Sequence, residues 1–431
     1  MAETTQRELS PRERLDAKKS ALWADRSSYE QQWRDVATFL MPTRPRWTVS
    51  DKARGDRRNL SIINNTATRA ANTLRSGLHA GLTSPARPWM KLSTPDPSLA
   101  QKPGVASWLA EVTRRMHAIF QLSNIYNAFP MLYGDVATFG TGAVAILEDE
   151  GSVDKPGDLF RAQVFPVGSF AVQMDGRGRP SLFIHETSKT VEQIVEEFGG
   201  PDGKPLEHKG TIDWSHISTA TKNLWERGHI TQRVTTYWAV HRNRDYSSRA
   251  LGAKEFPWAS CHWEAGAEGN KLLRESGFRE FPVMCPRWIA VPDEAYANDY
   301  PGITALGDVK QLQMMERKKG QAIEKMVNPA LVGPVNLQTQ KVSLLPGAVT
   351  YIDIREGMQG LRPIHEVRPD LTAFVLDAQA VERRIDSAFY VDLFLMLTLS
   401  SASGSQPPTA REVEERHEEK MLMLEIGRAH V

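Results

Sequence analysis

Three short stretches of this 431-residue chain hold the residue types from which catalytic and metal sites are built. "RHEEKM" resembles the start of a zinc-protease helix through His417 and Glu418, but the second histidine of that motif is absent. "GGPDGKP" resembles a phosphate-binding loop, yet its glycine spacing is wrong and Pro205 replaces the required Ser or Thr, which favours a β-turn. "CHWE" places Cys261 beside His262, and neighbours on a strand face opposite ways. These stretches predict no catalytic residue, no metal site and no cofactor.

The remaining reactive side chains follow patterns that are typical of structural roles. No G-x-S-x-G elbow is present, and most carboxylates lie in predicted helices beside Lys or Arg, as on exposed faces. Cys261 and Cys285 are far apart, whereas a disulfide framework or a zinc site needs more ligands at tighter spacing. We interpret them as two ordinary thiols in a reducing compartment.

Composition and charge narrow the class of protein. Hydrophobic residues make up 41% and charged residues 24%, which is ordinary for a soluble chain of two or three domains. No window approaches the ~20 apolar residues of a membrane span, and the polar N-terminus is unlike a secretory signal. The net charge is +1, although residues 1–91 hold 17 Lys and Arg against 9 Asp and Glu. Any contact with nucleic acid is therefore expected to be loose or confined to one local face.

One basic, turn-rich loop follows the first predicted helix and is the candidate for such a contact. Its cations are Arg44, Arg46, Lys52, Arg54, Arg57 and Arg58, against Asp51 and Asp56. Such a loop could touch phosphates without sequence preference, and a solvated surface loop is the alternative. The tryptophans lie in apolar runs, which favours core packing over base stacking; examples are Trp33, Trp89, Trp108, Trp214, Trp238 and Trp288.

The elements that must position these groups begin with helices. Ser10 and Glu13 form a capping box with Pro11 at the first helical position, and Pro42 ends that helix. "TATRAANTLRSGLHAGL" predicts a second helix, and residues 105–121 and 125–138 predict two more. "GTGAVAILED" reads as a strand, and 159–290 is mainly β.

Two long helices then flank a small β-rich insert. The first runs from Thr304 to Val327 and would span ~36 Å; its apolar stripe is Leu306, Val309, Leu312, Met315, Ile323 and Met326. Asn328-Pro329 ends it, about forty residues of strands and turns follow, and Asp370 starts the second helix. The buried side predicted for that helix is Leu371, Phe374, Ala378, Val381, Ile385, Ala388 and Phe389. A polar loop, "SSASGSQPP", precedes a last helix capped by Thr409 and Glu412.

The order of these elements resembles the portal, or head–tail connector, proteins of short-tailed double-stranded-DNA bacteriophages. The resemblance covers residues 26–424 and is densest at "YPGITALGDVKQLQMMERKKGQAIEKMVNPALVGP", "LLPGAVTYI" and "TAREVEERHEEKMLML". It implies a non-enzymatic α+β subunit with a helical and β wing, two stem helices flanking a clip, and a tunnel loop. The implied assembly is a ring, usually of twelve subunits, at a capsid vertex of the virion. DNA passes through that ring, and the ring binds terminase, tail adaptor, capsid and scaffolding proteins. No contact with a membrane is implied.

On this resemblance the chain divides into seven segments. They are a wing region at 1–303, a first stem helix at 304–329, a clip at 330–369, a second stem helix at 370–397, a tunnel loop at 398–411, the start of a C-terminal wing helix at 412–424, and a tail at 425–431. The family's wing continues beyond "EEKMLML". The tail "EIGRAHV" matches the translation of a common sequencing-library adapter, so Leu424 or Glu425 is expected to be the last natural residue.

Two groups of side chains are the candidate channel residues. The tunnel loop would place its narrowest lining at Ser400, Ser401, Ser403, Gly404, Ser405 and Gln406. A small uncharged lining suits a conduit, because each tight Lys or Arg contact favours a bound, stationary DNA. The stem cluster Arg317-Lys318-Lys319 interrupts the apolar stripe, and could face either the channel or a neighbour's acidic face.

Two other functions compete with a portal. A packaging enzyme would need a phosphate loop and an acidic metal cluster, and neither appears in the sequence. A different capsid or tail structural protein would keep self-assembly but would lack the DNA channel. A ring with an axial hole distinguishes a portal from both.

Overall fold

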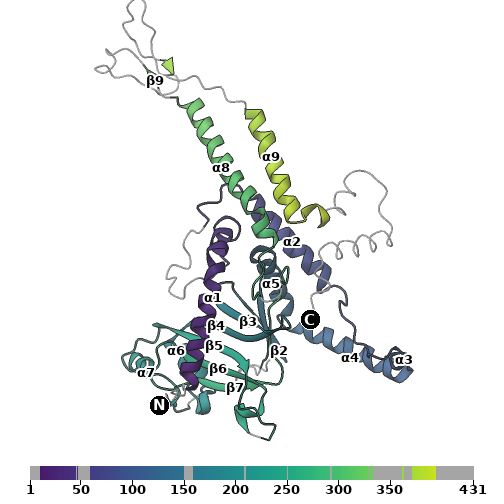
Figure 1. Cartoon of the computed structure of the whole chain (residues 1–431), viewed down its shortest axis with the longest axis vertical. Coiled ribbons are helices and arrows are strands. Elements are labelled where there is room, and N and C mark those ends of the chain that lie inside the picture. The colour runs from purple at the N-terminus through teal and green to yellow at the C-terminus, as the bar shows by residue number, and fades with distance from the viewer. Residues whose placement is uncertain are drawn as a thin grey trace, which may run out of the picture.

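A computed structural model describes residues 10–44, 46, 59–149, 159–207, 210–249, 251–291, 294–329, 331–332, 362–363 and 371–394. These residues form a body of helices and sheets from which two long helices project (Figure 1). The helices are α1 (Pro11–Phe39), α2 (Thr66–Leu82), α3 (Pro97–Ala100), α4 (Pro103–Leu122), α5 (Ile125–Phe139), α6 (Val191–Phe198), α7 (Thr219–Glu226), α8 (Pro301–Val327) and α9 (Leu371–Ala388), with short 3-10 turns at Pro201–Gly203 and Gly252–Glu255. The mixture confirms the predicted α+β class.

The sheets are antiparallel, and the largest one follows the order of the chain. A five-stranded sheet has the order β3-β4-β5-β6-β7, a three-stranded sheet has the order β2-β1-β8, and β9 pairs with β10. Their bounds are β1 Ala143–Glu148, β2 Phe160–Phe165, β3 Phe170–Met174, β4 Pro180–Thr190, β5 Arg233–Arg242, β6 Trp258–Glu264, β7 Arg274–Phe278, β8 Val283–Met284, β9 Leu331–Val332 and β10 Arg362–Pro363. Cys261 and His262 pack on opposite faces of β6, as the alternation of a strand requires.

Helix α1 lies across the large sheet and is fixed to it by polar contacts from both elements. The Ser10–Glu13 capping box forms as the sequence predicts. Buried Arg26 donates to the carbonyl oxygens of Gly168 and Phe170, each at 2.9 Å, and the Trp263 indole donates to Asp16 at 3.1 Å. Each contact satisfies a polar group inside the interface, which fixes the position of α1 on the sheet.

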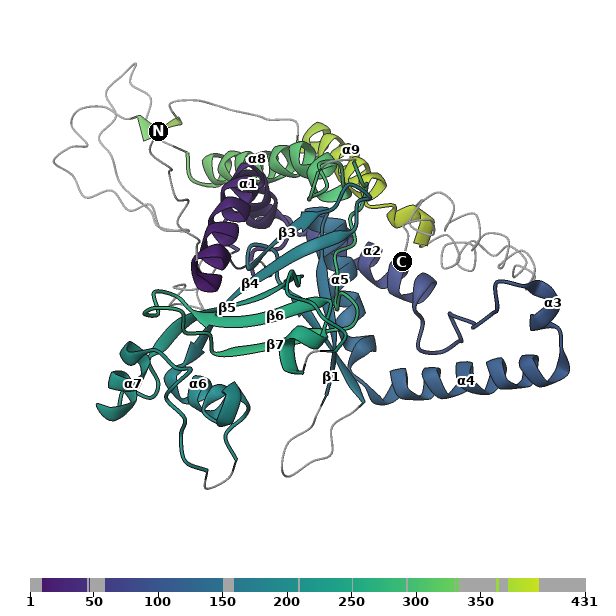
Figure 2. The ribbon, with the colours of Figure 1, turned by 60° about the horizontal axis from the view of Figure 1, so that its bottom comes forward.

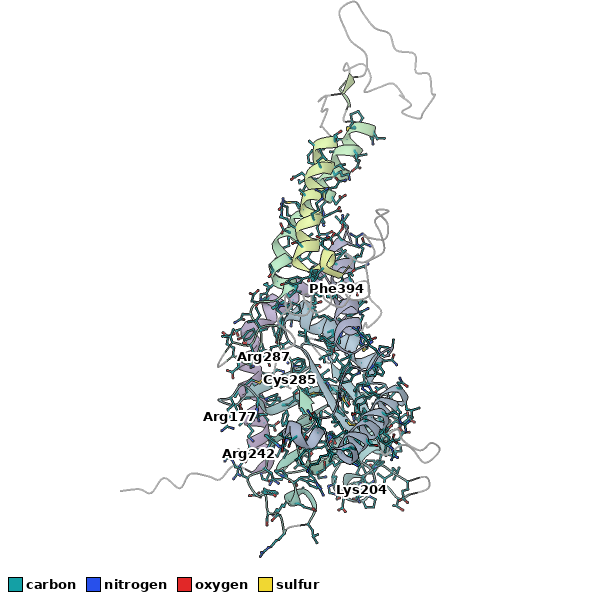
Figure 3. All side chains as sticks on the ribbon, turned by 90° about the vertical axis from the view of Figure 1, so that its right-hand side faces the viewer. Arg177, Lys204, Arg242, Cys285, Arg287 and Phe394 are labelled. Atoms are coloured by element: carbon teal, nitrogen blue, oxygen red, sulfur yellow. The ribbon has the colours of Figure 1, made fainter. Side chains whose placement is uncertain are left out.

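The main core joins α1, α2, α5 and the roots of the two projecting helices. Small residues on α2 permit close packing, notably Ala67, Ala70 and Ala71, all of which are buried. Gly302, in the first turn of α8, packs against α5. A Cβ on Gly302 would lie 2.1 Å from the Thr138 carbonyl oxygen, so the close approach of these two backbones requires glycine. Phe394 packs over Gly77 of α2 at the base of the projecting pair (Figure 3).

The structure corrects several sequence predictions. Helix α8 begins at Pro301, three residues before the predicted Thr304, because proline suits the first helical position. Trp108 is 62% exposed rather than in the core. Strands β6 and β7 lie in the region 159–290 that was predicted to be mainly β, whereas helix α7, which begins at a Ser218 cap, was not predicted.

The buried stripe of the projecting pair is also shorter than predicted. On α8 it ends near Leu312, whereas Ile323 and Met326 are exposed, and on α9 Phe374 is exposed. Beyond the body, a helix in a two-helix hairpin is covered only on the side that faces its partner. Most of the predicted clip (330–369) lies outside the described residues, as do the predicted tunnel loop at 398–411 and the segments after it.

Candidate stem and channel region

The antiparallel pair α8 and α9, here called the stem, projects from the body as a hairpin (Figure 1). Its proximal half is held by buried apolar side chains from both helices, namely Leu306, Val309, Leu312, Val381 and Ile385. Arg384 on α9 adds an ion pair to Asp308 at 2.8 Å and a hydrogen bond to Gln311 at 3.3 Å. These two bridges are largely solvent-exposed, so apolar burial carries most of the stabilisation.

A polar clamp fixes the root of the stem to the start of α2. Buried Gln313 accepts hydrogen bonds from the backbone N–H groups of Ile63 (2.6 Å) and Asn64 (2.9 Å), and donates to the Asn64 carbonyl at 2.7 Å. The Asn64 side chain donates to Glu382 of α9 at 2.9 Å and accepts from the Thr66 backbone at 2.9 Å. One network therefore joins α8, α9 and the beginning of α2.

The stem basic cluster lies just beyond this clamp. Arg317 and Lys318 are exposed, while Lys319 pairs with Glu316 at 3.7 Å on the same helix. The exposed pair is available to a polyanion or to an acidic surface of another chain. Toward the tip, the stem exposes apolar side chains as well, namely Ile323, Met326 and Val327 on α8 and Phe374, Val375 and Leu376 on α9.

Arg44, the first cation of the predicted basic loop, is engaged inside the body. Its Nε and Nη2 atoms bind the two carboxylate oxygens of Asp135 on α5, at 2.7 and 2.6 Å. Burial raises the pKa of Asp135 to about 6, and the nearby charges of Arg44 and Arg75 oppose that rise. A bidentate pair of this kind fixes the entry to the loop, so Arg44 serves as its anchor.

The other predicted contact residues are only partly described. The Arg46 backbone N–H bonds to Val167 at 2.9 Å, and its side chain donates to the Thr43 carbonyl at 3.1 Å. Outside the described residues lie Lys52, Arg54, Arg57 and Arg58, together with the tunnel-loop candidates Ser400, Ser401, Ser403, Gly404, Ser405 and Gln406. The contact of both groups with DNA stays a prediction.

Over the described parts of the chain, side chains do not gather into a metal centre, and no helix is long and apolar enough to cross a membrane. Cys261 and Cys285 are both buried free thiols; Cys285 lies within the body (Figure 3). Burial raises the pKa of each thiol to about 12, which keeps the nucleophilic thiolate scarce at neutral pH.

Comparison with known proteins decides between the candidate classes. A family model described as "Bacteriophage head to tail connecting protein" matches residues 12–425. The chain belongs to this family of head-to-tail connecting proteins. It is 40% identical over 413 residues to the "Portal protein" of Salmonella phage epsilon15, covering 96% of this chain and 70% of that relative. It is 38% identical over 425 residues to the "Probable portal protein" of Bordetella phage BPP-1, covering 98% and 71%.

The match confirms the portal resemblance that the sequence predicted. Sequence reasoning missed the clamp of Gln313, Asn64 and Glu382 and the anchor residue Asp135. A polar residue within the apolar stripe of α8 was a signal for Gln313, because a buried amide needs partners. For Asp135, the signal was a carboxylate within the apolar run of α5.

Proposed function

We propose that this chain is the portal subunit of a bacteriophage, and that it forms a ring at one capsid vertex. The ring, of twelve subunits as is usual in the family, encloses a channel for double-stranded DNA during packaging and ejection. It docks terminase and later tail adaptor proteins, and meets capsid and scaffolding proteins. Its role is structural, with no catalytic residue, metal or cofactor.

The proposal rests on the projecting stem, which is found here in a chain that belongs to the connecting-protein family. Two long helices, packed together at their root, extend away from the sheet-containing body (Figure 1). Their outer halves expose apolar residues such as Met326 and Leu376. Neighbouring stems would cover these groups in a ring, since apolar surface removed from water stabilises an assembly by about 25 cal/mol per Å².

The charge pattern supports a channel through which DNA slides. The whole chain carries a net charge of +1, and residues 400–406, the proposed lining of the tunnel loop, include serines, glycine and glutamine but neither Lys nor Arg. Each tight cation–phosphate contact would add counterion-release energy that opposes sliding. In this arrangement Arg317 and Lys318 face either the channel or an acidic surface of a neighbour.

Electron microscopy of the purified chain tests the proposal. A closed ring with an axial hole is the expected result, and sheets, filaments or monomers would contradict it. A matched pair of variants sharpens the test. Met326→Glu places a charge on the exposed apolar surface of the stem and should disperse rings, whereas Gln321→Glu, an exposed polar position on the same helix, should leave them intact.

A further inference from the structure

Helix α4 and the short helix α3 form an arm that extends from one side of the body, crosswise to the stem (Figures 1 and 2). Among the residues of α4, which are all described, Leu109 alone is buried. One side of the helix is covered by the segment before α3: Trp89 stacks on Phe120, and the Leu92 N–H donates to Thr113 at 3.2 Å. The arm therefore has one covered side and one open side.

The open side of α4 presents a regular stripe. Trp108, Arg115 and Leu122 recur at seven-residue intervals, which places them on one line along a helix. Their side chains are 62%, 71% and 76% exposed. Glu111 pairs with both Arg114 (2.8 Å) and Arg115 (2.7 Å), so this part of α4 carries a net positive charge. An exposed tryptophan flanked by arginines is the composition found at the centre of protein interfaces.

A surface of complementary chemistry lies on the other side of the body, at α6 and α7 (Figure 2). Helix α6 carries three glutamates and neither Lys nor Arg. Glu197 pairs with Lys189, while Glu192 and Glu196 are exposed. Half-buried apolar side chains lie beside them, namely Leu206, Trp214 and Trp225. Lys222 of α7 lies over the Trp214 ring and pairs with Glu226 at 3.8 Å, so its charge is matched on the same helix. This side therefore offers apolar surface for Trp108, and Glu192 and Glu196 offer negative charge for the arginines of α4.

We infer that the α4 arm of one subunit docks on the α6–α7 side of the next copy of this chain. The inference rests on the proposed ring, in which each subunit meets its neighbours through two different surfaces. A head-to-tail contact of that kind needs complementary patches on opposite sides of the molecule, and repetition closes a ring. The arm and the α6–α7 side meet this requirement through their placement, charge and exposed apolar groups. The contact lies in the body and is separate from the stem.

Charge reversal on the two surfaces tests the inference. Arg114→Glu with Arg115→Glu, and separately Glu192→Lys with Glu196→Lys, should each lower the fraction of chains in rings at least tenfold. All four changes together should restore rings. Trp108→Ala should lower the fraction similarly, and Leu251→Ala, which removes an exposed apolar side chain from a distant loop, should leave it unchanged. Mass photometry measures the fraction, and circular dichroism establishes that each variant is folded.

The outcomes separate this inference from the proposed function. If the wild type forms rings and either reversed pair leaves them intact, the docking of α4 on α6–α7 is wrong while the portal function stands. A loss with either pair that the fourfold variant does not rescue also contradicts the inference. If the wild type forms open oligomers that the two reversals disrupt and their combination restores, the contact stands while the closed ring fails.

Discussion

Gln313 of α8 binds the backbone of Asn64 with both ends of its side-chain amide, accepting the N–H at 2.9 Å and donating to the carbonyl at 2.7 Å. The two residues are 249 positions apart in sequence. The Asn64 side chain in turn donates to Glu382 of α9, so both stem helices are hydrogen-bonded to the same residue. The direction of the stem relative to the body is thereby coupled to the start of α2.

Gln313→Leu should destabilise the fold by about 2–4 kcal/mol. The substitution leaves the N–H groups of Ile63 and Asn64 and the Asn64 carbonyl without these partners in a part-buried site, and each unsatisfied group costs about 1–3 kcal/mol. Gln321→Leu, at an exposed position two turns along α8, is the matched control and should change stability by less than about 0.5 kcal/mol. Denaturant unfolding measures both; equal effects would show that the clamp contributes nothing.

Gly302→Ala should destabilise by on the order of 1–3 kcal/mol, because its Cβ would lie 2.1 Å from the Thr138 carbonyl oxygen and force α8 away from α5. Gly307→Ala, one and a half turns further along α8, has nothing within 4 Å of the new methyl group. It should stabilise by about 0.5–1 kcal/mol through helix propensity. The two variants should change the melting temperature in opposite directions, and a loss of stability in both would contradict the packing at Gly302.

Asp135→Asn should remove one component of the pH dependence of stability. The pKa of Asp135 is raised from 3.8 to about 6 in the fold, so the folded chain retains a proton that the unfolded chain releases. The stabilisation by this proton is present at low pH and is lost as pH rises from about 4 to 6. The free energy of unfolding of the wild type minus that of Asp135→Asn should therefore fall over this window, by up to about 1.4 kcal/mol per pH unit. A constant difference would contradict burial of an ionisable carboxyl group.

His185→Phe should make the fold more resistant to acid. Burial, followed by the charge of Lys189, lowers the pKa of His185 from 6.5 to about 3. The unfolded chain takes up this proton first, so stability falls as pH drops from about 6.5 toward 3. Phenylalanine fits beside Phe165, whose ring centre lies 4.6 Å from that of His185, and it does not titrate. Chemical unfolding at each pH from 7 to 4 measures this. The free energy of unfolding of His185→Phe should depend on pH less steeply than that of the wild type, by up to about 1.4 kcal/mol per pH unit, and an equal slope would show that His185 titrates normally.

Local signals in the sequence predicted the helices well. The Ser10–Glu13 capping box and the small-residue spacing of α2 each act within a few residues, so a single chain reveals them. Pro301 at the first position of α8 is a signal of the same kind, and the prediction that began this helix at Thr304 missed it. The clamp between Gln313 and Asn64 could not be predicted, because it joins segments that only the fold brings together. The burial predicted for Ile323 and Trp108 was wrong for the same reason, because periodicity predicts an apolar side of a helix without showing what covers it.

The close packing at Gly302 and the clamp at Gln313 hold α8 at two points along its length. These points are about 16 Å apart, and the C-terminal end of α8 at Val327 lies about 21 Å beyond the clamp, at 1.5 Å per residue. If α8 rotates as a rigid rod about its close contact at Gly302, the displacement of each residue grows with its distance from Gly302. Sideways motion of the Asn64 segment by 1 Å would move the far end by about 2 Å, because rotation of a rigid helix scales with distance from its pivot. Small rearrangements in the body would thus be magnified about twofold at the tip.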